Sequence, residues 1–404
     1  MKKLLCLFLL CLVASTAHAD TYVSGDYKYI RPHYVDYKVV ITRYTGDATE
    51  VVIPDELDGR PVAYLGPEIF YENDALTSVT IPTGVTVDYF GNPFQHCSSL
   101  TTINIAPEDP VLKIVDGALI NKTEKRLICY PLGLGITSCD VPEGIEMVGS
   151  GAFANCTTLT SITLPDSVRE IGTGAFENCT GLTFVTLPDS VKEIGFGAFD
   201  GCSNLCSINI PDGVTVINSY SFSDCTDLSS ISIPNGVTEI GDRAFYRCTK
   251  LDEVFIPASV KSIGEHAFDY YFGGSRLSLG MAGYYPCCTL VVVRNSYAER
   301  YASSNGIPFT YADQEALTHA DQESQQQVGT TACPYCHGGW RDCTVCDTAG
   351  QCTYCFGSGY KSIYTSKGYE YRTCGLCRGT GACSMCGYSG FFQCSACGGT
   401  GIID

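Results

Sequence analysis

The chain has 404 residues, 45% hydrophobic and 17% charged, with a formal net charge of −18. This composition excludes a globally disordered protein, and the length allows two or more domains. The charge is uneven, because residues 20–328 carry 18 basic and 39 acidic side chains, whereas residues 329–404 carry five and four. The acidic part should repel nucleic acids and anionic membranes, so neither is expected as a partner.

The first residues have the pattern of an export signal. Met1-Lys2-Lys3 precede an apolar run from Leu4 to Val13, and small residues follow up to Ala19. This order predicts a bacterial Sec-type signal peptide over residues 1–19. The apolar run is about half the roughly 20 residues that a bilayer crossing needs, and no later segment is long enough. We therefore expect a mature protein without membrane insertion that is secreted, periplasmic or held at the cell surface.

Most of the following chain repeats with a period of 23 residues. The segment LTSITLPDSVREIGTGAFENCTG at Leu159 returns at Leu182, Leu205, Leu228 and Leu251, and less regular copies precede it from about residue 49, one with an insertion around Asp58-Gly59-Arg60. Each copy has a short alternating strand that ends at a proline, a second apolar segment and a Gly-Ala-Phe turn. One copy cannot bury its apolar side chains alone. The sequence therefore predicts a mainly β fold, with a solenoid of stacked copies over residues 20–311 and a helical C-terminal cap.

Two residue types keep the repeat register and should form columns. A buried phenyl column is expected from Phe153, Phe176, Phe199, Phe222, Phe245 and Phe268. A cysteine column is expected from Cys156, Cys179, Cys202, Cys225 and Cys248. Equivalent positions of stacked turns lie about 4.8 Å apart with parallel side chains, which is poor disulfide geometry, so we expect buried thiols that pack as small hydrophobes. Cys129 and Cys139 fall outside this register, and a disulfide between them stays open.

The repeats resemble the BspA-like, Treponema-type leucine-rich repeats, on the motifs LPDSV, EIG, GAF and NC. The resemblance covers about 290 residues and includes an irregular insert at 115–133 and a closing stretch at 295–309. The closing stretch predicts a capping helix from about Ser296 to Ser304, ended by Asn305-Gly306. The resemblance implies a bacterial or protist surface protein linked to adhesion and host contact. Its ligand would be a protein or a surface glycan.

The outward positions of the first strand in each copy are candidates for a ligand-binding face. Most are small and polar, as at Ser161, Thr163 and Ser207, which is also typical of a well-solvated strand. Three larger side chains break the pattern. The candidate ligand-binding residues on this face are therefore Phe184, Glu253 and Phe255.

A polar, glutamine-rich stretch at 312–330 predicts a flexible linker, and residues 331–404 beyond it contain six CxxC pairs. The pairs are Cys333 with Cys336, Cys343 with Cys346, Cys352 with Cys355, Cys374 with Cys377, Cys383 with Cys386, and Cys394 with Cys397. Their intervals of 6, 5, 18, 5 and 7 residues are nearly palindromic. A hairpin in the 18-residue interval would therefore bring the pairs together in nested fashion, four thiolates at a time, which predicts about three structural zinc ions. The segment has few aliphatic side chains, so metal binding would supply the folding free energy that a core cannot.

The motifs CTYCFGSG, CGLCRGTG and CSACGGTG resemble the CxxCxGxG repeats of the DnaJ-type cysteine-rich domain. The resemblance implies a small zinc-stapled domain rich in β-hairpins. One zinc would be held by the outer pairs, Cys333 with Cys336 and Cys394 with Cys397, and another by the inner pairs, Cys352 with Cys355 and Cys374 with Cys377. The two remaining pairs would form a third site. The chain has no His-Pro-Asp tripeptide, so stimulation of a partner chaperone is not implied.

Two other uses of the CxxC pairs stay open beside zinc. CPYCH at 333–337 has the form of a covalent haem attachment site, but no other pair is followed by histidine. Thiol–disulfide chemistry would suit an oxidising compartment.

The motifs of common hydrolases and nucleotide-binding enzymes are absent, so no enzyme is expected. The function hypotheses are an exported binding or adhesion protein, an extracytoplasmic factor that binds unfolded polypeptide or handles thiols, and a structural envelope component.

Overall fold

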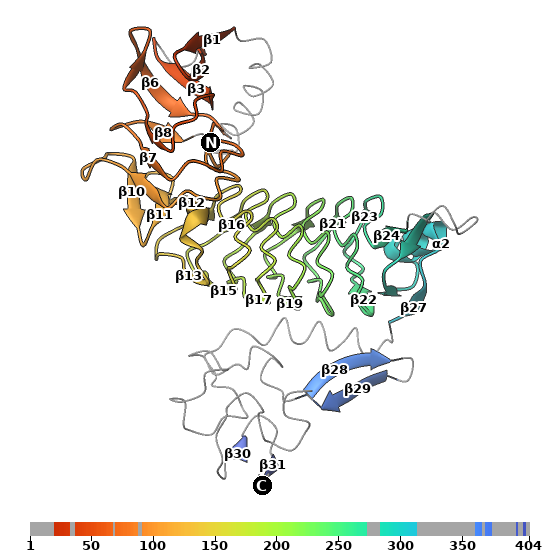
Figure 1. The fold of residues 1–404 in the computed structure, drawn as a ribbon. Helices are drawn as coiled ribbons and strands as arrows, with labels where there is room; N and C mark the ends of the chain where they lie inside the picture. Colours follow the sequence, from red (N-terminus) through yellow and green to blue (C-terminus); the bar gives the residue numbers. More distant parts are fainter. Residues whose placement is uncertain are drawn as a thin grey trace, which may run out of the picture. The chain divides into compact units, whose positions relative to one another are not determined.

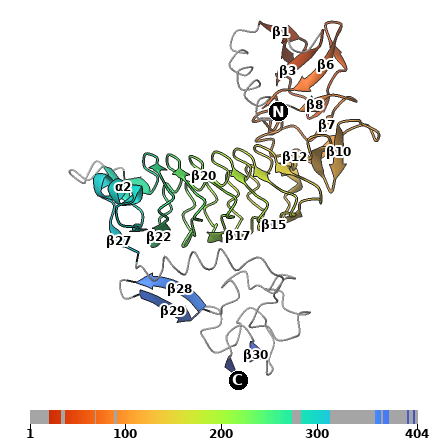
Figure 2. The ribbon, with the colours of Figure 1, turned by 180° about the vertical axis from the view of Figure 1, so that it is seen from behind.

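The computed structural model describes residues 20–32, 37–67, 69–87, 91–272 and 283–312, and the backbone of four short strands between residues 360 and 400 (Figures 1 and 2). The chain divides into two compact units, residues 1–309 and 310–404. The predicted linker after Ala312 and all the CxxC cysteines except Cys394, whose backbone lies in a strand, fall outside the described residues.

The first unit begins with antiparallel pairing that the repeat period does not predict. β1 (Thr21–Ser24), β2 (Tyr27–Ile30) and β3 (Val39–Tyr44) form a meander. β5 (Glu56–Leu57) and β6 (Arg60–Leu65) form a hairpin around Asp58 and Gly59, whose φ angles of 50° and 74° match the turn type favoured in two-residue hairpins. The predicted insertion around residue 58 is thus this hairpin. β3 pairs in parallel with β6, which joins the meander to the first turns.

Each later turn contributes strands to two rows, which Figure 1 shows along opposite edges of the stacked turns. One row consists of β4 (Glu50–Val52), β7 (Ser78–Thr80), β9 (Thr102–Asn104), β13 (Ser138–Asp140), β15 (Ser161–Thr163), β17 (Phe184–Val185), β19 (Ser207–Ile208) and β22 (Glu253–Ile256). The other consists of β8 (Thr86–Val87), β12 (Arg126–Cys129), β14 (Met147–Val148), β16 (Glu170–Ile171), β18 (Glu193–Ile194), β20 (Val216–Ile217), β21 (Glu239–Ile240) and β23 (Ser262–Ile263). In the regular turns, paired strands are parallel at the 23-residue offset, as in Glu170↔Glu193. The mainly β solenoid is confirmed.

The irregular insert is a small antiparallel sheet built into this stack. β10 (Leu112–Val115), β11 (Ala118–Asn121) and β12 pair antiparallel, and β12 then pairs in parallel with β14 of the next turn. A single 3-10 turn, η1 (Leu132–Leu134), follows and ends at Gly135, which is left-handed. The insert therefore interrupts the period and divides the second row, because β8 pairs with β6 in one sheet whereas β12 belongs to the next sheet with β11 and β14.

The phenyl column is confirmed. Its six rings are fully buried, and neighbouring ring centroids lie 5.1 to 5.6 Å apart with interplanar angles of 6° to 13°. The cysteine column is buried beside it, as predicted, and four of its five thiols, all but that of Cys156, also donate hydrogen bonds. Cys202 Sγ, for example, lies 3.0 Å from the carbonyl oxygen of Phe176 in the preceding turn. Burial raises the pKa of the Cys202 thiol to about 12. Cys129 and Cys139 are separate free thiols.

The glycine of the EIG motif is required by close packing between turns. A Cβ atom on Gly195 would lie 2.6 Å from the carbonyl carbon of Gly172, one turn earlier. Gly195 N donates to Ile171 O at 2.8 Å. Asn218 occupies the same register in the next turn, and there its side-chain Nδ2 donates to Ile194 O at 2.7 Å. The asparagine side chain thus replaces the backbone donor where glycine is missing.

Two positions in each regular turn have left-handed backbone. One precedes the column cysteine and holds Asn155, Asn178, Gly201, Asp224 and Arg247. The other lies two residues before the column phenylalanine and holds Gly151, Gly174, Gly197, Tyr220, Arg243 and His266. Left-handed backbone costs a residue with a side chain about 1 to 2 kcal/mol, and glycine adopts it freely. In the second half of this row, Tyr220, Arg243 and His266 therefore adopt a backbone conformation that is unfavourable for residues with a side chain.

The C-terminal cap agrees with the prediction for its helix. β24 (Asp269–Phe272) and β25 (Gly283–Pro286) form an antiparallel pair, and β26 (Thr289–Val292) lies between β22 and β27 (Phe309–Tyr311). α2 (Tyr297–Asn305) begins after Ser296, whose side chain accepts a hydrogen bond from Glu299 N. It ends at Gly306, which is left-handed with φ of 67°. Ser296 is thus the N-cap, and Gly306 lies in the usual C-terminal position of a helix.

The described strands of the second unit form two hairpins. β28 (Tyr360–Thr365) pairs antiparallel with β29 (Gly368–Thr373), and β30 (Gln393–Cys394) pairs antiparallel with β31 (Gly399–Thr400). The first hairpin lies within the 18-residue interval between the third and fourth CxxC pairs. This is the interval in which the sequence predicts a reversal of the chain.

Asp200 provides a pH test of the stacking. Partial burial, together with the nearby Asp224 and Glu177 carboxylates, raises the pKa of Asp200 from 3.8 to about 6. The folded state then binds more protons than the unfolded state between these values, so this group's contribution to stability falls as the pH rises from about 4 to about 6. We expect Asp200→Asn to be more stable than the parent by about 1 kcal/mol at pH 7, after allowance for solvent screening, and to lose this advantage near pH 4. Urea unfolding at both pH values measures the difference, and an advantage independent of pH would contradict it.

Candidate functional site

The three candidate residues of the outer strand face are not gathered in one place. Glu253 and Phe255 lie on the same face of β22, opposite Thr289 and Val291 of β26. Phe184 occupies the register of Glu253 but lies three turns earlier, which is about 14 Å at the spacing of paired strands. The face therefore offers two separate features and no single pocket built from the three side chains.

One of the polar side chains on this face, that of Asn209, forms hydrogen bonds within the fold. Asn209 accepts from Leu187 N and donates to Leu187 O, both at 2.8 Å. Glu253 differs, because its Oε2 atom is buried without a hydrogen-bond partner. Burial, and then the neighbouring Asp252, raise the pKa of the Glu253 carboxyl. Glu253 is thus the one of the three candidates whose side chain has an unmet polar requirement.

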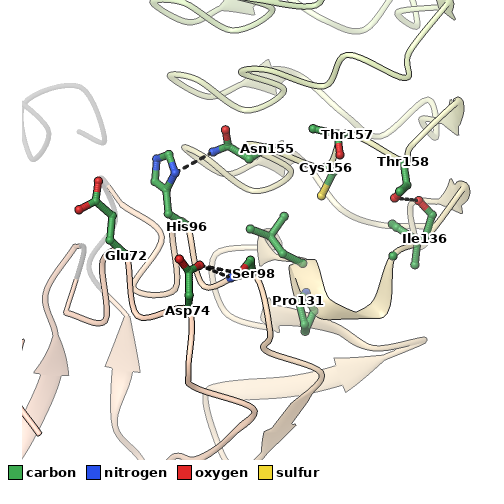
Figure 3. A pocket seen from close by; sticks show the side chains of 12 residues that line it. Glu72, Asp74, His96, Ser98, Pro131, Ile136, Asn155, Cys156, Thr157 and Thr158 are labelled. Atoms are coloured by element: carbon green, nitrogen blue, oxygen red, sulfur yellow. Dashed lines mark hydrogen bonds between the residues drawn. The ribbon is translucent and has the colours of Figure 1, made fainter. Parts of the chain in front are cut away.

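A cleft of about 620 Å³ lies near the N-terminal end of the solenoid, where the insert interrupts the repeats (Figure 3). Its walls come from four segments of the chain that lie far apart in sequence. These are Glu72 and Asp74, His96 and Ser98, Pro131 to Ile136, and Asn155 to Thr158. The volume is within the range of small-ligand sites in proteins.

The stacking of turns around the insert creates this cleft. Asn155 follows His96 by 59 residues, yet the insert loops out and Asn155 Nδ2 lies 3.4 Å from His96 Nδ1. Glu72, His96 and Asn155 all have left-handed backbone, with φ near 60°, so they are successive members of the row that precedes the column cysteine. The three residues occupy equivalent positions of successive turns. The sequence alone does not show this, because it does not reveal that their backbone is left-handed.

Polar groups in the cleft are held in fixed positions. Asp74 Oδ1 accepts a hydrogen bond from Ser98 Oγ at 2.5 Å, and Thr158 Oγ1 donates to Ile136 O at 2.8 Å. The His96 ring packs edge-on against Tyr71, with centroids 4.9 Å apart. Two carboxylates, an imidazole and several hydroxyl groups therefore line a site whose net charge is negative. Such a lining suits a ligand with a cationic or hydroxyl-rich group.

A cysteine and a histidine share this cleft, but they do not have the properties of a nucleophile and its base. Burial raises the pKa of the Cys156 thiol to about 12, so the thiol is protonated at neutral pH. His96 Nδ1 faces the Asn155 amide. The arrangement is suited to binding a ligand without covalent chemistry.

The twelve cysteines predicted to bind zinc lie outside the residues whose side chains the structure describes, so their ligation stays a prediction. They are Cys333, Cys336, Cys343, Cys346, Cys352, Cys355, Cys374, Cys377, Cys383, Cys386, Cys394 and Cys397. Among the described side chains, which include none of these twelve, no three His, Cys, Asp or Glu residues gather as a metal site would require. Within the described part of the chain, no helix has both the length and the apolar character needed to cross a bilayer.

A family model described as "BspA type Leucine rich repeat region" matches residues 45–130 and 135–272, with six copies. None of the curated proteins matches the chain. Among solved structures, the chain is similar to a leucine-rich-repeat protein of T. pallidum, with 27% identity over 57% of this chain and 91% of that chain and a TM-score of 0.32.

Two further solved structures are similar over longer stretches. A leucine-rich-repeat protein of Eubacterium ventriosum has 19% identity over 66% of this chain and 100% of that chain, with a TM-score of 0.44. A leucine-rich cell surface protein of Faecalibacterium prausnitzii has 22% identity over 74% of this chain and 97% of that chain, with a TM-score of 0.34.

Proposed function

The chain belongs to the BspA-type leucine-rich-repeat family, and on that premise we propose that it is an exported, non-catalytic binding protein of the adhesion type. The signal peptide expected at residues 1–19 would deliver it to the cell surface, the periplasm or the medium. The solenoid would hold a protein or surface glycan ligand, and the cysteine-rich segment would be a second, zinc-stabilised module.

The cleft at the insert carries this proposal. Its lining comes from four chain segments that only the stacked fold brings together, and Asp74, Ser98 and Thr158 are held by hydrogen bonds before any ligand arrives. Preorganised polar groups lose little conformational entropy on binding. The carboxylates of Glu72 and Asp74 favour a protein ligand that presents a lysine or arginine side chain.

Neutralising the cleft should weaken this binding. Labelled mature protein is first applied to a peptide array in which cationic side chains vary, and the tightest binder is then measured by calorimetry. Glu72→Gln combined with Asp74→Asn should lower its affinity at least about tenfold, because a charged contact in a preorganised cleft is lost. The exposed pair Glu143→Gln and Asp212→Asn removes the same charge elsewhere and should change the affinity less than about twofold. Equal effects of the two double variants would contradict a role for the cleft.

We also propose that the twelve C-terminal cysteines bind about three zinc ions in nested pairs. The hairpin β28–β29 supports this, because it reverses the chain within the interval that separates the third pair from the fourth. The inner site would be formed by Cys352, Cys355, Cys374 and Cys377. Four thiolates form a closed tetrahedral set, which suits a structural zinc ion.

The other two sites would follow from the same reversal of the chain. The middle site would be formed by Cys343, Cys346, Cys383 and Cys386, and the outer site by Cys333, Cys336, Cys394 and Cys397. The backbone of Cys394 lies in β30, which pairs with β31, so the outer site would include one ligand held on a hairpin.

Elemental analysis tests the zinc proposal without any assay of activity. Protein purified under non-reducing conditions should contain about three zinc ions per chain, and Cys352→Ser combined with Cys374→Ser should lower the content to about two. A metal-free protein whose CxxC cysteines are joined by disulfides, as shown by mass mapping, would overturn the proposal and favour thiol–disulfide chemistry.

A further inference from the structure

A row of aromatic and planar side chains lies along the C-terminal half of the solenoid. We name it the aromatic stripe, and it consists of Phe196, Tyr220, Arg243, Tyr246, His266, Tyr271 and Tyr284. Three of its rings are about half exposed, with fractions of 52% for Phe196, 51% for Tyr271 and 45% for Tyr284. Aromatic rings exposed in a continuous row on a folded protein commonly mark a binding surface.

Contacts between neighbouring turns hold the stripe together. The Phe196 and Tyr220 ring centroids lie 5.1 Å apart, and the Arg243 guanidinium lies 5.5 Å from the Tyr220 ring and donates to its hydroxyl. The His266 ring stacks on Tyr284 with a centroid distance of 3.7 Å. The two halves of the stripe are linked through Tyr246, because the Arg243 guanidinium lies 5.8 Å from the Tyr246 ring and Tyr271 N donates to the Tyr246 hydroxyl at 3.2 Å. These side chains are therefore preorganised.

The backbone beneath the stripe gives a second, independent observation. Tyr220, Arg243 and His266 are the residues that occupy the left-handed row in place of glycine, with φ angles of 60°, 52° and 56°. Earlier turns have Gly174 and Gly197 at the same position. Residues kept in an unfavourable backbone conformation tend to cluster where a protein binds or switches. Within this row, from Gly151 to His266, glycine is exchanged for a residue with a side chain only in turns that carry the stripe, which points to a function for these side chains.

The shape of the stripe narrows the choice of ligand. Each turn contributes only one or two side chains, whereas a stable interface between globular proteins involves roughly 20 to 30 residues on each side. The backbone below is also occupied, since Gly197 N, Tyr220 N and Arg243 N each donate to a carbonyl of the following turn at 2.9 to 3.0 Å. No strand can therefore be added along this row of amides. A narrow row of ring faces instead fits a linear chain with flat, partly apolar units.

We propose that the aromatic stripe binds a linear, neutral polysaccharide. The C–H faces of pyranose rings would stack on the rings of Phe196, Tyr271 and Tyr284, and sugar hydroxyls would meet Arg243, His266 and the tyrosine hydroxyls. Acidic polysaccharides are disfavoured, because residues 20–328 carry 39 acidic and only 18 basic side chains. This surface is separate from the cleft, so the two proposals can fail independently.

Calorimetry of the mature chain with neutral β-linked gluco-, manno- and xylo-oligosaccharides tests the proposal. At least one series should bind, and Tyr220→Gly and Tyr284→Ser should each weaken binding at least about tenfold. Tyr220→Gly introduces the residue that earlier turns have at this position, so its thermal midpoint should equal or exceed that of the parent. A loss of binding in this variant at an unchanged thermal midpoint cannot come from unfolding.

A matched control removes an exposed ring outside the stripe. Tyr64 on β6 is 36% exposed, and Tyr64→Ser should leave the affinity for the same oligosaccharide within about twofold. The proposal is overturned if no neutral series binds, or if the stripe variants bind as well as the parent. Binding of a proline-rich peptide by the stripe in place of the sugars would also overturn it, because such peptides use aromatic-lined grooves too.

Discussion

The stacking of one turn on the next is the interaction on which the rest of this structure depends. The core is continuous from turn to turn, since each phenylalanine of the column stacks on those of the neighbouring turns, at centroid distances of 5.1 to 5.6 Å. The thiols of Cys179, Cys202, Cys225 and Cys248 each donate to a carbonyl of the preceding turn, and the EIG glycine allows the backbones to approach closely. Stability is therefore a property of neighbouring pairs of turns, as in other repeat proteins.

This arrangement fixes the interior of each turn and leaves the outside free to vary. The cleft lies where the insert interrupts the period, because the insert separates His96 from Asn155 by 59 residues while their side chains lie 3.4 Å apart. The aromatic stripe lies where the left-handed row exchanges glycine for larger residues, from Tyr220 onward. Both candidate binding surfaces are thus departures from the repeat, carried on a core that does not change.

The sequence predicted the features of the fold that follow from the 23-residue period. Phe199 and Cys202 recur at a fixed interval, so their columns, their burial and the absence of a disulfide ladder followed from the spacing of turns. The helix after Ser296 followed from its capping residues.

The sequence did not reveal the cleft, because contact between His96 and Asn155 depends on how the insert leaves the stack. The strain at Tyr220 was not predicted either, because the sequence does not show which residues have a left-handed backbone. The outer-face candidates were placed on the right strands, but Phe184 is too far from Glu253 to act with it.

The unfolding free energy of Phe199→Ala tests the stacking most directly, with Phe196→Ala as the comparison from the same turn. Phe199 is fully buried between two other rings of the column, whereas Phe196 is 52% exposed. Removal of the Phe199 ring should lower the unfolding free energy by about 3 to 5 kcal/mol, and removal of the Phe196 ring by less than about 1 kcal/mol. Similar losses for the two variants would show that the phenyl column does not hold the turns together.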